Sequence, residues 1–92
     1  MKSRRERIET LLTQVFKPEF ISILDESRFH QGHHSFPEGG SETHFRVLIV
    51  SASFSEISRL ERQRQVNAVL KDEFSQGLHA LALKIYSPEE FT

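Results

Sequence analysis

The segment Gly77–Tyr86, which reads GLHALALKIY, limits most strictly what this chain can fold into. Its large apolar residues recur at every second position, Leu81, Leu83 and Ile85, and this period is that of a strand with one buried face. Counting back by two places His79 on the same buried side, at the first residue of the strand. There the ring can either pack as a structural histidine or leave the core and act as a ligand.

A helix and a strand are predicted near the start of the chain. The range Arg4–Phe16 has apolar residues at the helical spacing i, i+3, i+4, i+7 and i+8. Ser3 suits the N-cap, and Pro18 is expected to end the helix. The β-branched and aromatic run Phe20–Asp25 predicts a strand. The apolar stripe of the helix consists of Ile8, Leu11, Leu12, Val15 and Phe16.

The range Thr43–Ser51, THFRVLIVS, predicts a second strand whose centre is apolar on both sides. Phe45, Val47 and Ile49 share one face, and Leu48 and Val50 lie on the other. A strand of this kind belongs in the middle of a sheet, where both faces are at least partly covered. His44, which opens this strand, is expected at the rim of the sheet.

The chain after Phe54 predicts a short helical turn and then a longer helix that ends near Gly77, a residue favoured at helix C-termini. The apolar stripe of that helix is Val66, Val69, Leu70 and Phe74. After the last strand, Ser87, Pro88 and Glu90 have the pattern of a capped helix start, which predicts a final helical turn.

These elements predict one α+β domain over residues 1–92, with a three-stranded mixed sheet and helices on one face. The first two strands form an antiparallel hairpin. A helical crossover leads from the second strand to the third, and such connections make the joined strands parallel and right-handed.

Composition excludes several classes of function. The 92 residues have a net charge of −1, which argues against general electrostatic binding of nucleic acid. They contain no cysteine, so the chain can form neither a disulfide nor a thiolate ligand. No apolar run approaches the roughly 20 residues of a membrane span, and we expect a cytoplasmic protein. The sequence contains no GxSxG, HExxH, P-loop or GxGxxG motif, which favours a non-enzymatic binding or adaptor module.

Two further groups of residues have functional potential. The loop Arg28–Ser41 holds His30, His33 and His34, a residue type suited to zinc, but no carboxylate is placed as a fourth ligand, which favours a solvated polar loop. A polar helix face offers arginine, glutamine and asparagine side chains that suit base reading, and a short helix before a longer one is similar to a helix-turn-helix. The alternative is that this face is only a solvated basic surface. Under either interpretation the polar face consists of Arg59, Arg62, Gln63, Arg64, Gln65 and Asn67.

Four segments, in this order and over nearly the whole chain, resemble the BolA family: DES (Asp25–Ser27), GGSETHFRVLIVS (Gly39–Ser51), RQRQVNAVL (Arg62–Leu70) and GLHALALKIYSPEEF (Gly77–Phe91). The resemblance implies a fold like the class II KH domain. It also implies partnership with a monothiol glutaredoxin, with glutathione, in handling a [2Fe-2S] cluster. The chain is expected as a monomer or weak homodimer.

The resemblance further implies that His79 is a cluster ligand and that a loop histidine, best matched by His30, is the second, with His33 and His34 as alternates. Relatives commonly have RHR where this chain has Gln63 between two arginines, so a role for that middle histidine is absent here. Histidine can replace cysteine on one iron of such clusters. Without cysteine, the chain is expected to bind a cluster only when a partner supplies thiolates, and only while the imidazoles are neutral.

A DNA-binding transcriptional regulator is the competing hypothesis. It would use the helix face that bears Arg59, Arg62, Arg64, Gln65 and Asn67. Against it, the GxxG loop with which KH domains clamp a nucleic-acid backbone is missing from the helical region of the sequence.

Overall fold

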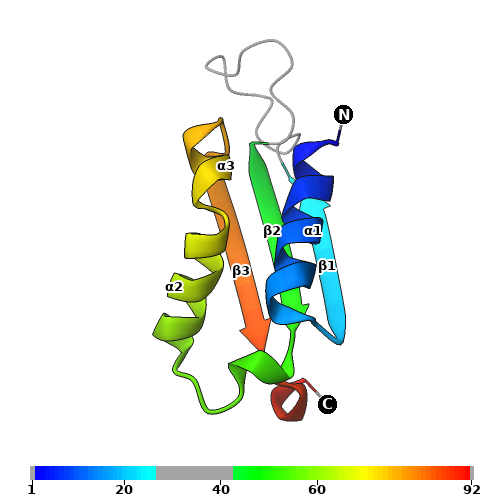
Figure 1. Cartoon of the computed structure of the whole chain (residues 1–92), viewed down its shortest axis with the longest axis vertical. Helices are drawn as coiled ribbons and strands as arrows, with labels where there is room; N and C mark the ends of the chain where they lie inside the picture. The colour runs from blue at the N-terminus through cyan, green and yellow to red at the C-terminus, as the bar shows by residue number, and fades with distance from the viewer. Residues whose placement is uncertain (1, 27–42, 92) are drawn as a thin grey trace.

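The structure, a computed structural model, describes residues 2–26 and 43–91. The predicted loop Arg28–Ser41 therefore lies outside the described residues. Within them, the expected order of helices and strands is confirmed (Figure 1). The elements are α1 (Arg4–Phe16), β1 (Phe20–Asp25), β2 (His44–Val50), a 3₁₀ turn (Ala52–Phe54), α2 (Arg59–Val69), α3 (Lys71–Ser75), β3 (Ala80–Tyr86) and a second 3₁₀ turn (Pro88–Glu90).

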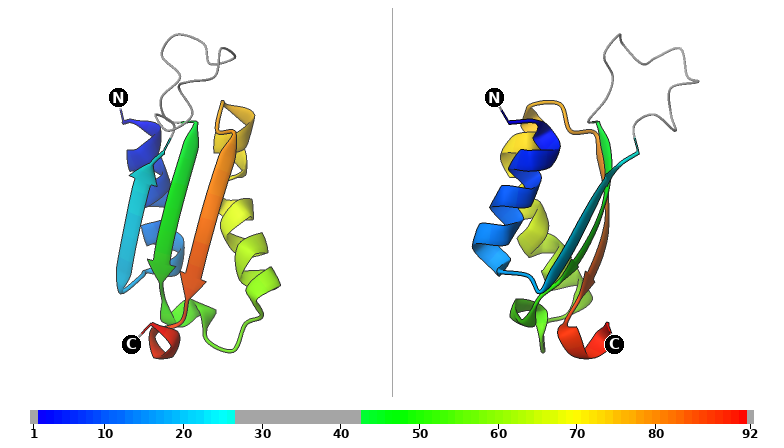
Figure 2. Two further views of the ribbon diagram at one scale, coloured as in Figure 1. Left: turned by 180° about the vertical axis from the view of Figure 1, so that it is seen from behind. Right: turned by 90° about the vertical axis from the view of Figure 1, so that its right-hand side faces the viewer.

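The three strands form one mixed sheet in the order β1-β2-β3, with β2 in the centre as predicted. β1 and β2 are antiparallel, whereas β2 and β3 are parallel. The helices cover one face of this sheet and leave the other face without a helix (Figure 2). The predicted α+β fold with a two-layer arrangement is confirmed.

The core lies between the helices and the covered face of the sheet. Alternation along β2 points Phe45, Val47 and Ile49 toward the helices, and each of them is almost completely buried. Leu81, Leu83 and Ile85 of β3 pack against this core, as their spacing predicts. The helices and the segment before β3 contribute Ile8, Leu12, Phe16, Val66, Leu70 and Leu78.

The start of α1 has a complete capping box. The Ser3 backbone N–H donates to Glu6 Oε1 at 2.9 Å, and the Glu6 N–H donates to Ser3 Oγ at 3.2 Å. These hydrogen bonds lower the pKa of Glu6. The predicted stripe of α1 is wrong in one place, because Val15 is 53% exposed. It lies at the edge of the buried face, which is centred on Ile8, Leu12 and Phe16.

The long helix predicted to end near Gly77 is divided in two. Leu70, with φ −98° and ψ 12°, ends α2, and α3 begins directly after it. The change of direction turns Glu73 inward, where it is 5% exposed, and leaves Phe74 37% exposed. The prediction of Phe74 as a core residue is therefore wrong, because it assumed that one helical period continued through Leu70.

Glu73 is buried because two arginines of α1 meet its carboxylate. Arg4 Nε donates to Oε1 at 3.1 Å, and Arg7 donates from Nε to Oε2 at 2.8 Å and from Nη2 to Oε1 at 3.0 Å. Hydrogen bonding from Arg7, more than that from Arg4, lowers the pKa of Glu73 although burial opposes the shift. Gly77, with φ 122°, follows this cluster, and a Cβ there would lie 3.0 Å from Arg4 Nη2.

Within residues 2–26 and 43–91, none of the helices has both the length and the apolar character needed to cross a bilayer.

We predict that Glu73→Gln lowers the free energy of unfolding by about 1–2 kcal/mol, because charged hydrogen bonds to Arg4 and Arg7 are lost. The matched control is Glu9→Gln. Glu9 Oε1 lies 3.7 Å from Nη1 of the exposed Arg5, one helical turn earlier, and loss of this surface pair should lower the free energy of unfolding by no more than about 0.5 kcal/mol. Urea denaturation measures both, and equal effects would contradict this account.

The stabilisation by Glu73 should depend on pH. Its folded-state pKa is lowered, so the contribution is present above the unfolded pKa of about 4.3 and is lost as the pH falls through the lower folded value. The difference in unfolding free energy between wild type and Glu73→Gln should therefore shrink as the pH falls below about 4. A difference that grows on acidification would contradict the assigned direction.

Candidate functional site

The backbone at the start of β3 turns His79 outward. The N–H groups of both His79 and Ala80 donate to the carbonyl oxygen of Thr43, at 2.8 and 3.1 Å. Two consecutive residues facing one acceptor interrupt the alternation of the strand. Leu78, 3% exposed, enters the core, and His79 is exposed. Of the two possibilities predicted for His79, packing in the core or leaving it, the structure therefore shows the second, and its ring is accessible to a partner.

His44 lies beside His79 on the neighbouring strand. The two ring centroids are 6.0 Å apart, with the ring planes at 78°. His44 Nδ1 and Thr43 Oγ1 form a hydrogen bond of 2.9 Å. Because His44 precedes the buried Phe45 in β2, its side chain belongs to the helix-free side of the sheet. The half-buried His44 confirms its predicted position at the rim.

The two imidazoles do not complete a metal site by themselves. Among the residues with described positions, no group of three or more histidine, aspartate or glutamate side chains could hold a metal ion. His30, His33 and His34, the other predicted ligands, lie outside the described residues. Glu26 and Thr43 are the described residues on either side of that segment. The Glu26 N–H donates to the His44 carbonyl oxygen at 2.8 Å, and the Thr43 carbonyl oxygen accepts from the His79 N–H at 2.8 Å. Both belong to the His79 end of the sheet.

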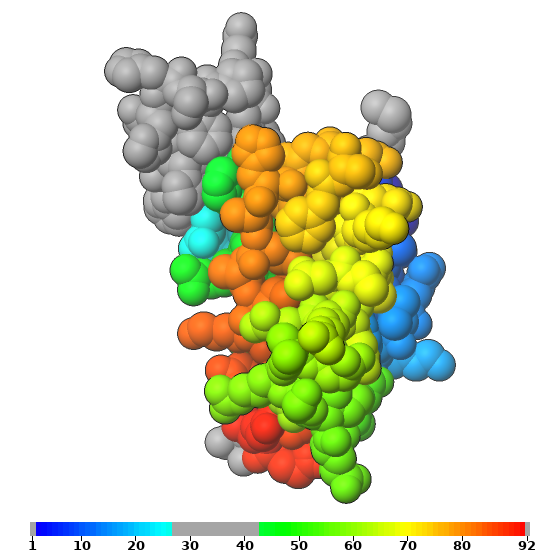
Figure 3. Space-filling model, turned by 90° about the vertical axis from the view of Figure 1, so that its left-hand side faces the viewer, coloured from blue at the N-terminus to red at the C-terminus, as the bar shows by residue number. Residues whose placement is uncertain are grey.

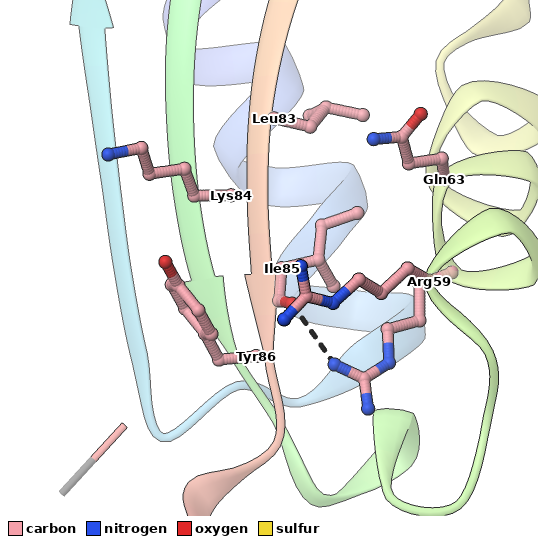
Figure 4. A pocket seen from close by; sticks show the side chains of 7 residues that line it. Arg59, Gln63, Leu83, Lys84, Ile85 and Tyr86 are labelled. Atoms are coloured by element: carbon pink, nitrogen blue, oxygen red, sulfur yellow. Dashed lines mark hydrogen bonds between the residues drawn. The ribbon is translucent and has the colours of Figure 1, made fainter. Parts of the chain in front are cut away.

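Arg62, predicted on the exposed polar face of the helix, is buried with 5% exposure, so that placement is wrong. Its Nε donates to the Ile57 carbonyl oxygen at 2.8 Å, and its Nη1 donates to the Ile85 carbonyl oxygen at 3.1 Å (dashed in Figure 4) and to Glu90 Oε1 at 2.7 Å. Hydrogen bonding from Arg62 lowers the pKa of Glu90 to about 2. Arg62 therefore joins α2 to β3 and to the final turn.

The remaining polar residues of α2 stay at the surface. Arg59, Arg64 and Asn67 are exposed, and Gln65 is half-buried. The space-filling view shows α2 and α3 lying along the side of β3 (Figure 3). The short element before α2 is a single 3₁₀ turn, Ala52–Phe54, so the first helix of a helix-turn-helix is not formed there.

A hollow of about 180 Å³ lies between α2 and the C-terminal half of β3. Arg59 and Gln63 extend from α2 toward β3, whereas Lys84 and Tyr86 point away from α2 (Figure 4). This hollow is formed near the end of β3, whereas His79 precedes its start, so the two features are separate. It is lined by Arg59, Arg62, Gln63, Leu83, Lys84, Ile85 and Tyr86.

Sequence reasoning missed the structural role of Arg62 and the pairing of His44 with His79. The first was detectable, because Arg62 lies four and eight residues before Val66 and Leu70 and so shares their buried stripe. The second was only partly detectable. Parallel pairing of the strands brings their first residues together, but the contact depends on the turn at His79.

The structure is that of a small α+β domain of KH-like order, with two neighbouring imidazoles at one end of its sheet. Residues 12–90 match the family model described as BolA-like protein. A protein of Escherichia coli (strain K12) named DNA-binding transcriptional regulator BolA is 41% identical over 87 residues, which cover 95% of this chain and 78% of that protein.

Solved structures agree with this match. BolA1 from Arabidopsis thaliana superposes with a TM-score of 0.89 at 33% identity, covering 100% of this chain and 99% of that one. The BolA domain of SufE1 from Arabidopsis thaliana gives a TM-score of 0.85 at 36% identity, covering 98% of both chains. This chain belongs to the BolA family.

We predict that Arg62→Lys lowers the melting temperature by about 5 °C or more, because an ammonium cannot reproduce the hydrogen bonds to Ile57, Ile85 and Glu90. Arg64→Lys is the matched control, since Arg64 is exposed and its Nη1 lies 4.0 Å from Glu61 Oε1 in a loose surface pair. It should leave the melting temperature unchanged. Equal melting temperatures for the two variants by differential scanning calorimetry would contradict the role of Arg62.

Proposed function

We propose that this BolA-family domain is a non-catalytic adaptor that binds a monothiol glutaredoxin and helps to hold a shared [2Fe-2S] cluster. The partner and its glutathione supply thiolates, and His79 supplies an imidazole. The role is in the assembly or trafficking of iron–sulfur clusters or in the sensing of iron. The observation that carries the proposal is the outward position of His79, immediately before β3, in a chain without cysteine.

The geometry around His79 suits a ligand that meets an incoming protein. The Thr43 carbonyl oxygen fixes the backbone at His79 and Ala80, and the buried Leu78 anchors the residue before them. A backbone held in this way reduces the conformational entropy lost when the imidazole is coordinated. The exposed ring can reach metal bound on another protein without unfolding the core.

The second imidazole in this proposal is that of His30, with His33 and His34 as alternates. Glu26 and Thr43 flank their segment, and both are joined by hydrogen bonds to the end of the sheet where His79 lies. A loop ligand next to a strand ligand would allow this chain to complete the shell around one iron. Thiolates for the remaining positions must come from the partner, because the chain has none.

We predict that His79→Ala abolishes the change in visible circular dichroism that follows addition of a cluster-loaded monothiol glutaredoxin, because a ligand is removed. His79→Cys should restore a cluster-bound complex with a shifted spectrum, since a thiolate can take the position. Gln76→Ala, an exposed polar change close to this turn, is the control and should titrate like wild type.

Two results would contradict the proposal. One is an unchanged titration for a correctly folded His79→Ala variant. The other is stoichiometric iron and sulfide on the isolated chain after reconstitution, because a chain with no cysteine should not hold a cluster alone.

DNA binding is a second candidate function, favoured by the exposure of Arg59, Arg64 and Asn67 on α2. The relative from Escherichia coli carries the name of a DNA-binding regulator. On this proposal α2 faces the DNA, and Arg62 acts only by holding α2 to the sheet.

If α2 binds DNA, Arg59→Ala with Arg64→Ala should weaken binding and lower the slope of log affinity against log salt by about 2, because two phosphate contacts are lost. The control is Lys2→Ala with Lys17→Asn, which removes two positive charges from the ends of α1. Fluorescence anisotropy at several salt concentrations measures both. Equal loss of affinity in the two double variants would show non-specific attraction and contradict recognition by α2.

A further inference from the structure

The pair formed by His44 and His79 is itself close to the geometry of a metal site. Zinc–nitrogen bonds of 2.0–2.1 Å place an imidazole ring centre about 3.2 Å from the metal, so two rings that share an ion have centres no more than about 6.4 Å apart. The observed separation is 6.0 Å. A tetrahedral angle at the ion requires a shorter separation than this, so the two rings must move closer together when an ion binds.

The backbones that carry the two rings are fixed by the sheet. His44 is the first residue of β2 and pairs in register with Ala80. His79 is held by its own N–H bond to the Thr43 carbonyl oxygen. Two imidazoles on a rigid frame bind an ion with less loss of conformational entropy than two on a free chain.

Thr43 provides a partner for the nitrogen of His44 that does not face a metal. Metal-bound histidines usually donate their other ring N–H to an oxygen, which fixes the tautomer. The 2.9 Å contact between His44 Nδ1 and Thr43 Oγ1 fits this role. Ligation through Nε2 leaves that hydrogen bond intact, with Nδ1–H as the donor.

We propose that His44 and His79 together bind a divalent transition-metal ion of the kind that prefers imidazole, such as Zn²⁺, Ni²⁺ or Cu²⁺. The exposed position of His79 leaves room for water as a further ligand. If His79 also binds the cluster as proposed above, the ion and the cluster exclude each other, and only this consequence rests on the proposed function.

The test uses the untagged full chain with His30, His33 and His34 changed to asparagine, so that only the two proposed ligands remain. Isothermal titration with Zn²⁺ should give one ion per chain. Long-range ¹H–¹⁵N spectra of the imidazoles should show both rings shifting with the same saturation curve. Adding His44→Gln or His79→Gln to this background should weaken zinc binding at least tenfold. Adding Thr43→Val, which removes the hydroxyl that hydrogen-bonds His44, should weaken zinc binding about tenfold or more.

The proposal is overturned if this background variant binds no zinc, if only one ring shifts, or if His44→Gln leaves the affinity unchanged in a chain whose far-ultraviolet circular dichroism is native. Competition is measured separately, by adding Zn²⁺ to the complex of wild type with cluster-loaded glutaredoxin. Displacement of the cluster supports the shared use of His79. Zinc binding without displacement preserves the metal site and contradicts only the cluster role of His79.

Discussion

The carbonyl oxygen of Thr43, which accepts hydrogen bonds from the N–H groups of both His79 and Ala80, determines how the third strand enters the sheet. A regular strand would continue its alternation backward and bury His79. The shared acceptor instead sends Leu78 into the core and His79 to the surface. The same contact brings His79 beside His44. One backbone feature therefore sets both the burial of the core at this end and the exposure of the candidate ligand.

Two arginine–glutamate clusters join the helices to one another and to the chain that follows β3. Arg4 and Arg7 of α1 meet Glu73 of α3, which directly precedes the turn into β3. Arg62 of α2 meets Glu90 after the end of β3. The clusters thus lie before and after the same strand. Each joins segments far apart in sequence, and together they restrain the helical crossover that makes β2 and β3 parallel.

Much of this architecture follows from local patterns in the sequence. The bounds of α1 and β1 agree with those predicted, because a capping serine, a proline and a change from helical to β-branched spacing mark their ends. The central position of β2 follows from its apolar residues on both faces. Parallel pairing with β3 follows from the length and helical character of the connection.

The errors arise where long-range contacts overrule a local period. The spacing of Phe74 predicts burial only if α2 continues past Leu70, whereas the charges of two arginines on α1 draw Glu73 inward. Arg62 has a charge that suggests exposure, but Glu90 and two carbonyl groups satisfy it inside. The outward turn of His79 depends on an acceptor on another strand, so the alternation of β3 could not reveal it.

We propose that the exposed imidazole of His79, just before β3, becomes a ligand to iron held mainly by another protein. Pulsed electron paramagnetic resonance of the reduced complex with cluster-loaded glutaredoxin, made with ¹⁵N-histidine only in this chain, tests that coordination directly. If His79 binds the cluster, the spectrum should show a strong ¹⁵N hyperfine coupling that includes a component missing from the His79→Cys complex. A cluster bound in the complex without strongly coupled ¹⁵N would show that its shell contains no imidazole from this chain, and would contradict the account.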